Sequence, residues 1–159
     1  MAVQAPGSTV SIVEMPLRDV VAKSQLILVA KVEEISSDPF LNAEDDEPEI
    51  RFFQLRVEEV LKPKVTTSAP AKGTTIQAFD PRDLFQHQHY QLIRAGVISF
   101  AEQRYPTKAE NIAEGDHLIF FLNEQPPLKG FPVEHAYVFA AGQAYDVVAQ
   151  KAVVVQLLR

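Results

Sequence analysis

The chain contains no cysteine, which excludes disulfide bonds, thiol catalysis and zinc sites built on cysteine. It has only six glycines, and none of them falls in a Gly-x-Gly-x-x-Gly or Walker pattern, so neither common nucleotide-binding turn is present. No apolar run approaches the roughly 20 residues of a bilayer-spanning helix. The sequence therefore predicts no membrane span and no nucleotide cofactor.

Positive charge is also scarce. The chain carries 15 Lys and Arg against 21 Asp and Glu, which gives a net charge of −6 and a pI near 5.2. Proteins that bind nucleic acids usually present a basic face to the phosphate backbone. Nucleic acid is therefore not the expected partner, and a barrel that binds single-stranded nucleic acid is kept only as an alternative.

What is present fits one globular domain. With 159 residues, 47% of them hydrophobic and 23% charged, the chain is long enough to bury a single core. We expect residues 1–14 to be a flexible segment and residues 15–159 to form the domain. The first ten residues lack the cationic and apolar regions of a signal peptide but resemble the segment after a cleavage site. We expect a periplasmic or secreted protein without its leader; a cytoplasmic one is the alternative.

The first half of the chain predicts one helix and three strands. Residues 15–25 show the apolar spacing of a short helix, and residues 25–35 read as a strand that is apolar on both faces in its first half. Residues 36–49, with two prolines and six acidic residues, predict a loop. The alternation in residues 50–62 predicts a second strand, antiparallel to the first, and residues 74–80 predict a third with Ile76 and Ala78 inward.

The second half predicts a helix followed by strands. Asp80 as N-cap, Pro81 at the first position and Gly96 beyond the last turn predict a helix over residues 81–95. Residues 97–100 are a short apolar segment, and residues 117–124 and 133–142 read as strands. Residues 144–149 and 152–158 predict a C-terminal β-hairpin, because several of them are β-branched valines. A helix is the alternative for this last segment.

Three strands, a helix and two more strands is the element order of the oligonucleotide/oligosaccharide-binding (OB) barrel. The fold we expect is mainly β: a five-stranded OB-like Greek-key barrel with a helix between strands three and four, a short N-terminal helix and the C-terminal hairpin. Four segments also resemble the bacterial domains of the tissue-inhibitor-of-metalloproteinase and netrin-like family. They are "LRDVVAKSQLILVAKVEEI", "FQLRVEEVLK", "EGDHLIFFL" and "AAGQAYDVVAQKAVV".

The resemblance implies a non-enzymatic module of the cell envelope or secreted fraction that binds a partner protein, with inhibition as one form that this binding could take. Animal inhibitors of this family chelate a protease zinc through an N-terminal cysteine, and this chain has none, so that mechanism does not carry over. Ala30 also stands where the family more often has glycine. Barrels of this type bind on the outer face of strands two and three, here Arg51, Phe52, Gln54, Arg56, Thr75 and Gln77.

Histidines are the main candidates for other chemistry. His87 and His89 form a His-x-His pair, but on a helix they point about 200° apart and cannot share a metal ion; we expect His89 at the core edge and His87 in solvent. The acidic residues of 44–49 lack the spacing of a calcium loop. We therefore expect no metal and no cofactor.

The alternative from another class is a small hydrolase or metal-dependent enzyme. It would use His117 or His135 with Asp116 or Glu134, which flank predicted strand starts. No Gly-x-Ser-x-Gly turn or Ser-His-Asp set supports it, and antiparallel pairing of the two strands would place the histidines near opposite strand ends. We therefore expect no enzyme activity.

Overall fold

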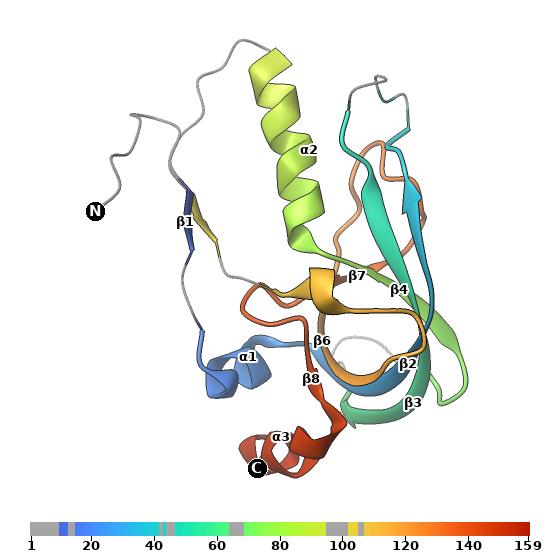
Figure 1. Ribbon diagram of the computed structural model, residues 1–159, viewed down its shortest axis with the longest axis vertical. Helices are drawn as coiled ribbons and strands as arrows, with labels where there is room; N and C mark the ends of the chain where they lie inside the picture. Colours follow the sequence, from blue (N-terminus) through green and yellow to red (C-terminus); the bar gives the residue numbers. More distant parts are fainter. Residues whose placement is uncertain are drawn as a thin grey trace.

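The computed structural model describes residues 10–12, 15–41, 43, 47–63, 69–94, 102–104 and 107–159, and they form a mainly β protein with three α-helices (Figure 1). Two short 3₁₀ turns, at Ala109–Asn111 and Val148–Gln150, complete the elements. In chain order the helices and strands are β1 Val10–Ile12, α1 Leu17–Lys23, β2 Leu26–Asp38, β3 Ile50–Lys62, β4 Thr75–Phe79, α2 Pro81–Arg94, β5 Glu102–Arg104, β6 His117–Glu124, β7 Tyr137–Phe139, β8 Tyr145–Val147 and α3 Lys151–Leu157.

Five strands pair in a ring. β2 pairs antiparallel with β3, β3 with β4, and β6 with both β7 and β2, while β4 and β7 run parallel. β8 adds to β6 at residues 118–120, on the edge that β7 occupies further along the strand. The predicted order of three strands, a helix and two strands is thus confirmed, as is the antiparallel pairing of β2 with β3. Separately, β1 pairs in parallel with β5. β1 lies within residues 1–14, the segment expected to be flexible.

Two apolar clusters pack against the two faces of β2. One cluster, which includes Leu28, Ala30, Phe53 and Phe120, takes one face of β2 and β3. The other face of β2 packs against the two short helices, where Ile27 and Val29 meet Val20 and Val21 of α1 and Val154 of α3. This arrangement explains why the first half of β2 is apolar on both faces, as its sequence predicts.

The C-terminal hairpin is the main error of the sequence prediction. Its first arm is reduced to β8, and its second arm is α3, a helix. β-branched residues lose helix stability by a few tenths of a kcal/mol each, whereas Val154 in α3 is fully buried against β2 and β6. The free energy gained by burying Val154 outweighs the low helix propensity of the valines. The strand predicted over residues 133–142 is also shorter than expected and is limited to β7.

α2 begins where its sequence predicts, after an aspartate that holds the first turn. Asp80 is fully buried, and its carboxylate accepts hydrogen bonds from the backbone N–H and the Nε of Arg82 and from Thr107 Oγ1, each at 2.9 Å. Arg82 Nη2 also lies 2.5 Å from Glu110 Oε2. This network fixes the start of α2 to the segment that leads into β6. The apolar segment 97–100 lies outside the described residues.

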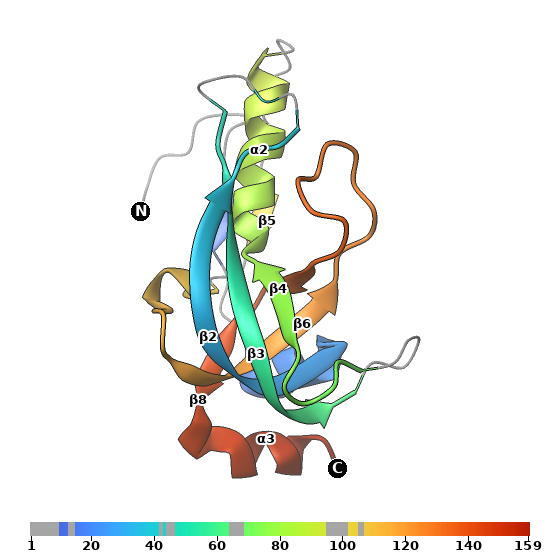
Figure 2. The ribbon, with the colours of Figure 1, turned by 90° about the vertical axis from the view of Figure 1, so that its right-hand side faces the viewer.

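α2 and α3 lie at opposite ends of the molecule. Figures 1 and 2 both show α2 rising beyond the strand ends, beside the connection between β2 and β3, and α3 at the far end. Among the described residues, none of the helices has the length and apolar character required to cross a membrane.

Candidate functional site

The outer face of β3 and β4 changes from open to covered along its length. Cross-strand partners on this face are Arg56 with Thr75, Gln54 with Gln77, and Phe52 with Phe79. The first pair is exposed, the second is half-buried, and the two phenylalanines are fully buried. Four of the six predicted binding residues therefore keep solvent contact as two adjacent pairs, and half-buried Arg51 lies beside Asp83 of α2.

Phe52, the predicted aromatic binding residue, is not on the surface, and that prediction is wrong. Its ring packs edge-on against Phe79, with centroids 6.1 Å apart, and against Phe131, at 5.8 Å. Phe131 comes from the loop 125–136 between β6 and β7, which folds over this end of the sheet. Phe52 points outward from the sheet as its position in the strand predicts, but the loop buries it in a third apolar cluster.

The loop 125–136 also contacts the connection between β2 and β3. Leu41 donates its backbone N–H to the carbonyl of Gly130 at 2.8 Å. Gly130 has φ of +80°, a conformation that glycine adopts at little cost. Phe40, next to Leu41, is buried and meets Phe131 edge-on at 6.1 Å. The two loops therefore form one continuous surface.

α2 supports this pair of loops through His87. The imidazole stacks on Phe40 with the rings 7° from parallel, and its Nδ1 lies 2.7 Å from Glu47 Oε1. The two atoms are at ion-pair distance but not aligned for a hydrogen bond. Burial lowers the pKa of His87 below its ordinary value, and the nearby Glu47 carboxylate opposes that shift. The His87 side chain is 16% exposed, so the prediction that it lies in solvent is wrong; the His89 side chain lies outside the described part.

Two leucines protrude from the joined loops. Leu41 is 62% exposed and Leu128 is 36% exposed, although their neighbours Phe40 and Phe131 are packed inward. We call Leu41, Leu128 and the backbone contact between Leu41 and Gly130 the two-loop surface. Its exposed apolar side chains are carried on backbone that buried aromatic rings hold in place, an arrangement typical of interaction surfaces.

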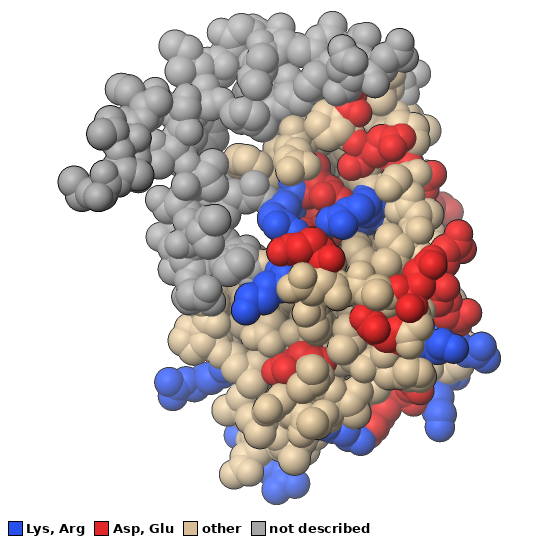
Figure 3. Space-filling view, viewed as in Figure 1, with Lys and Arg blue, Asp and Glu red and all other residues tan. Residues whose placement is uncertain are grey.

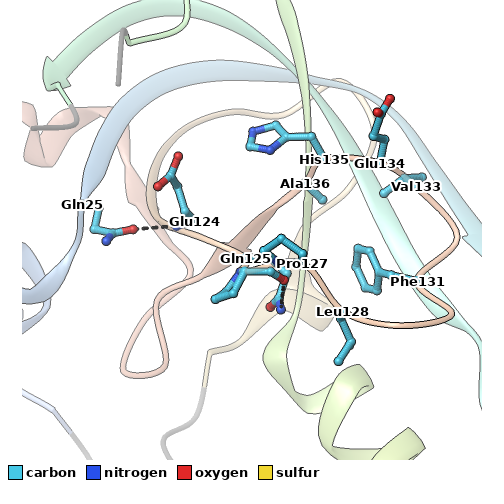
Figure 4. Close-up of a pocket in the computed structure, with 11 residues that line it drawn as sticks. Gln25, Glu124, Gln125, Pro127, Leu128, Phe131, Val133, Glu134, His135 and Ala136 are labelled. Carbon is cyan, nitrogen blue, oxygen red and sulfur yellow. Dashed lines mark hydrogen bonds between the residues drawn. The ribbon is translucent and has the colours of Figure 1, made fainter. Parts of the chain in front are cut away.

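A hollow of about 650 Å³ opens beside Leu128 (Figure 4). Leu128 and Phe131 form an apolar side, whereas the side chains of Glu124 and His135 lie at another side. Gln25 accepts the backbone N–H of Glu124 at 2.7 Å and so closes one end. Among the described residues that line the hollow, only Glu124, Glu134 and His135 have ionisable side chains. The hollow is therefore partly apolar and tends toward negative charge.

The four side chains of the enzyme hypothesis do not form one group. His117 starts β6, whereas His135 lies near the opposite end of that strand, beside Gln125 and Ala136. His117 Nδ1 contacts Glu58 Oε1 at 2.7 Å, and Asp116 accepts the backbone N–H of Ala113. Glu134 points away from His135 (Figure 4). No three His, Asp or Glu residues of the described part lie close enough to hold a metal ion.

Buried charge lies at the start of α2 rather than in the hollow. Asp83 is buried, and its Oδ2 accepts the backbone N–H of Arg51 at 3.0 Å. Burial raises the pKa of the Asp83 carboxyl, and that hydrogen bond opposes the shift. This contact ties the first turn of α2 to the start of β3. Because both partners are occupied in joining elements, we assign the network to structure.

No family model matches the chain, and no curated protein matches it at a significant level. The sequence prediction missed the leucines of the two-loop surface as well as Phe131. Two prolines and a glycine in 126–130 mark an irregular loop. Nothing in its spacing indicates that this loop would meet residue 41, because the two positions lie in different loops far apart in the sequence.

Proposed function

We propose that the chain is an OB-like barrel of the tissue-inhibitor-of-metalloproteinase and netrin-like type that binds a partner protein and catalyses no reaction. The strand pairings support the fold: the first and fourth strands of the ring pair, the third and fifth run parallel, and the helix lies between the third and fourth. We place the protein in the periplasm or outside the cell, as the sequence led us to expect.

The observation that carries the function is the two-loop surface. Leu41 and Leu128 present apolar area to solvent on loops that buried rings fix in place, so little conformational entropy is lost when a partner covers them. The hollow beside Leu128 offers a recess for a side chain of the partner. Exposed anchors beside a recess are the usual centre of a protein interface.

Affinity capture from the envelope and secreted fractions of the source organism tests this proposal. The immobilised wild-type protein is compared with a Leu41→Asp/Leu128→Asp variant, and captured proteins are identified by mass spectrometry. We expect a partner that the double variant loses, and that the purified partner binds the wild type directly. Replacing an apolar anchor by a charge is expected to weaken binding by roughly 100-fold.

Val153→Asp is the matched control, since Val153 is 46% exposed on α3, away from the loops. Like each of the two loop substitutions, it introduces one aspartate in place of an exposed apolar side chain, and it should retain the partner. Absence of any reproducible partner, or equal capture by the loop double variant and the wild type, would contradict the proposal.

A further inference from the structure

We propose that a second site, a basic groove on the outer side of β2 and β3, binds an acidic segment of a partner protein. The groove has a volume of about 470 Å³ and is lined by residues of β2, of β3 and of the turn before β4. Its basic residues are Lys31, Arg56 and Lys72. It lies toward the opposite end of β3 from the loop 39–49, so it is distinct from the two-loop surface. We define it by these three residues as the basic groove.

The register of the strands places basic side chains in a row. Lys31 of β2 is paired with Arg56 of β3 on one side and with His117 of β6 on the other. Like charges directly opposite each other across a pair of strands destabilise the sheet. The row of Lys31 and Arg56 charges is therefore unfavourable in the free protein, and an anion placed over these two side chains would relieve the repulsion.

These cations are weakly neutralised by the protein itself. Lys31 and Lys72 make no ion pair within the described part of the chain, and Arg56 reaches Glu33 only at 3.9 Å with its side chain 58% exposed. An exposed contact at that distance contributes little. The charge on the three basic residues is therefore available to a ligand.

The carboxylates in the groove are already occupied. Glu58 contacts His117 Nδ1 at 2.7 Å, and Glu59 pairs with Lys151 at the start of α3. Both partners lie outside the residues that line the groove. Glu59 is therefore compensated by a cation outside the groove, and Glu58 is directed toward β6. The three basic residues of the groove outnumber the one carboxylate charge that remains, so they determine what the groove attracts.

The groove fits an acidic peptide better than a nucleic acid. Val29 and Val57 supply apolar lining, and none of the described residues that line the groove has an aromatic side chain on which a base could stack. Acidic side chains gather along the side of the molecule where β2 and β3 lie (Figure 3), and the net charge is −6. A nucleic-acid strand longer than the groove would place phosphates over these acidic side chains, which would repel them. A short acidic peptide can keep its carboxylates over the basic row.

Fluorescence anisotropy with a labelled oligoglutamate peptide at low salt tests the proposal on the whole chain. We expect saturable binding that weakens as salt is raised. A Lys31→Gln/Arg56→Gln variant is expected to bind on the order of tenfold more weakly. Lys129→Gln removes an exposed charge from the loop 125–136 and should bind like the wild type. Leu41→Asp/Leu128→Asp should also bind normally, which separates this site from the proposed function.

Three results would overturn the proposal. The first is the absence of saturable oligoglutamate binding at low salt. The second is an equal loss of binding in Lys129→Gln and in the groove variant. The third is tighter binding of a labelled oligo-dT than of oligoglutamate, which would assign the groove to nucleic acid. Thermal unfolding of each variant shows that it is folded, since both substitutions in the groove replace exposed side chains.

Discussion

The outer face of β3 and β4 has a covered end and an open end, although the same alternation of side chains runs through both. At the covered end, Phe52 and Phe79 lie beneath loop 125–136. At the open end, Arg56 and Thr75 remain exposed, and Arg56 stands opposite Lys31. The positions are equivalent within the strand, so the difference comes from what lies over them.

The two ends also differ in what would bind there. The covered end holds two loops in place and raises Leu41 and Leu128 into solvent, an apolar surface. The open end exposes two like charges, Lys31 and Arg56, on paired strands, and Lys31 makes no ion pair within the described residues. One face of one sheet can therefore present an apolar site and a basic site, and substitutions at its two ends should have very different effects.

The largest effect is expected from Phe52→Ala. Removing this fully buried ring leaves a cavity between β3 and the loop 125–136, and the free energy of unfolding should fall by about 3–5 kcal/mol. Arg56→Gln, at the open end of the same face, should change it by less than about 0.5 kcal/mol. Urea unfolding of both variants measures the difference. Similar values for the two would mean that the loop does not cover Phe52 in solution.

The sequence predicts the strands well because the alternation of apolar and polar residues indicates which face of each strand is buried. The bounds of β3 and β6 match the prediction, and Ala78 lies in the core as expected. α2 also begins as predicted, because the Asp80–Pro81 start signal is local to the chain. Helices and strands that are determined by their own residues can therefore be predicted from the sequence.

The errors arise where a segment distant in the sequence determines the local structure. Val153, Val154 and Val155 favour a strand locally, but the pocket that accepts Val154 is made by β2, β6 and α1. Phe52 is correctly oriented, yet it is buried by Phe131, which lies in another loop. The candidate site has the same origin, since the two-loop surface exists only because Leu41 meets Gly130.

A smaller effect is expected from acidification, and it should appear at the covered end. Burial lowers the pKa of His87 below its ordinary value of about 6.5. When the pH falls below about 6.5, the unfolded chain therefore binds more protons than the folded one. The stability contributed by neutral His87 is therefore complete above that pH and falls as the pH is lowered toward the folded pKa. The protonated ring would weaken the support that α2 gives to Phe40.

Urea midpoints at neutral pH and near pH 5 measure this effect. The His87→Gln variant should lose less stability than the wild type on acidification, because the buried imidazole is gone. His135→Gln, which removes an exposed histidine of the loop 125–136, should keep the wild-type dependence. If His87→Gln and the wild type lose equal stability, His87 does not carry the pH dependence.

The smallest effect is expected at the open end and has the opposite sign. Lys31→Gln removes one of the two like charges that Lys31 and Arg56 place on paired strands, so the free energy of unfolding should rise by about 0.2–1 kcal/mol. Lys129→Gln removes a charge outside the row and should leave stability unchanged. Thermal unfolding at low salt compares them, and raising the salt should reduce the gain because screening weakens the repulsion. A loss of stability in Lys31→Gln would show that these basic side chains do not repel each other. Relief of repulsion would then not favour anion binding in the basic groove.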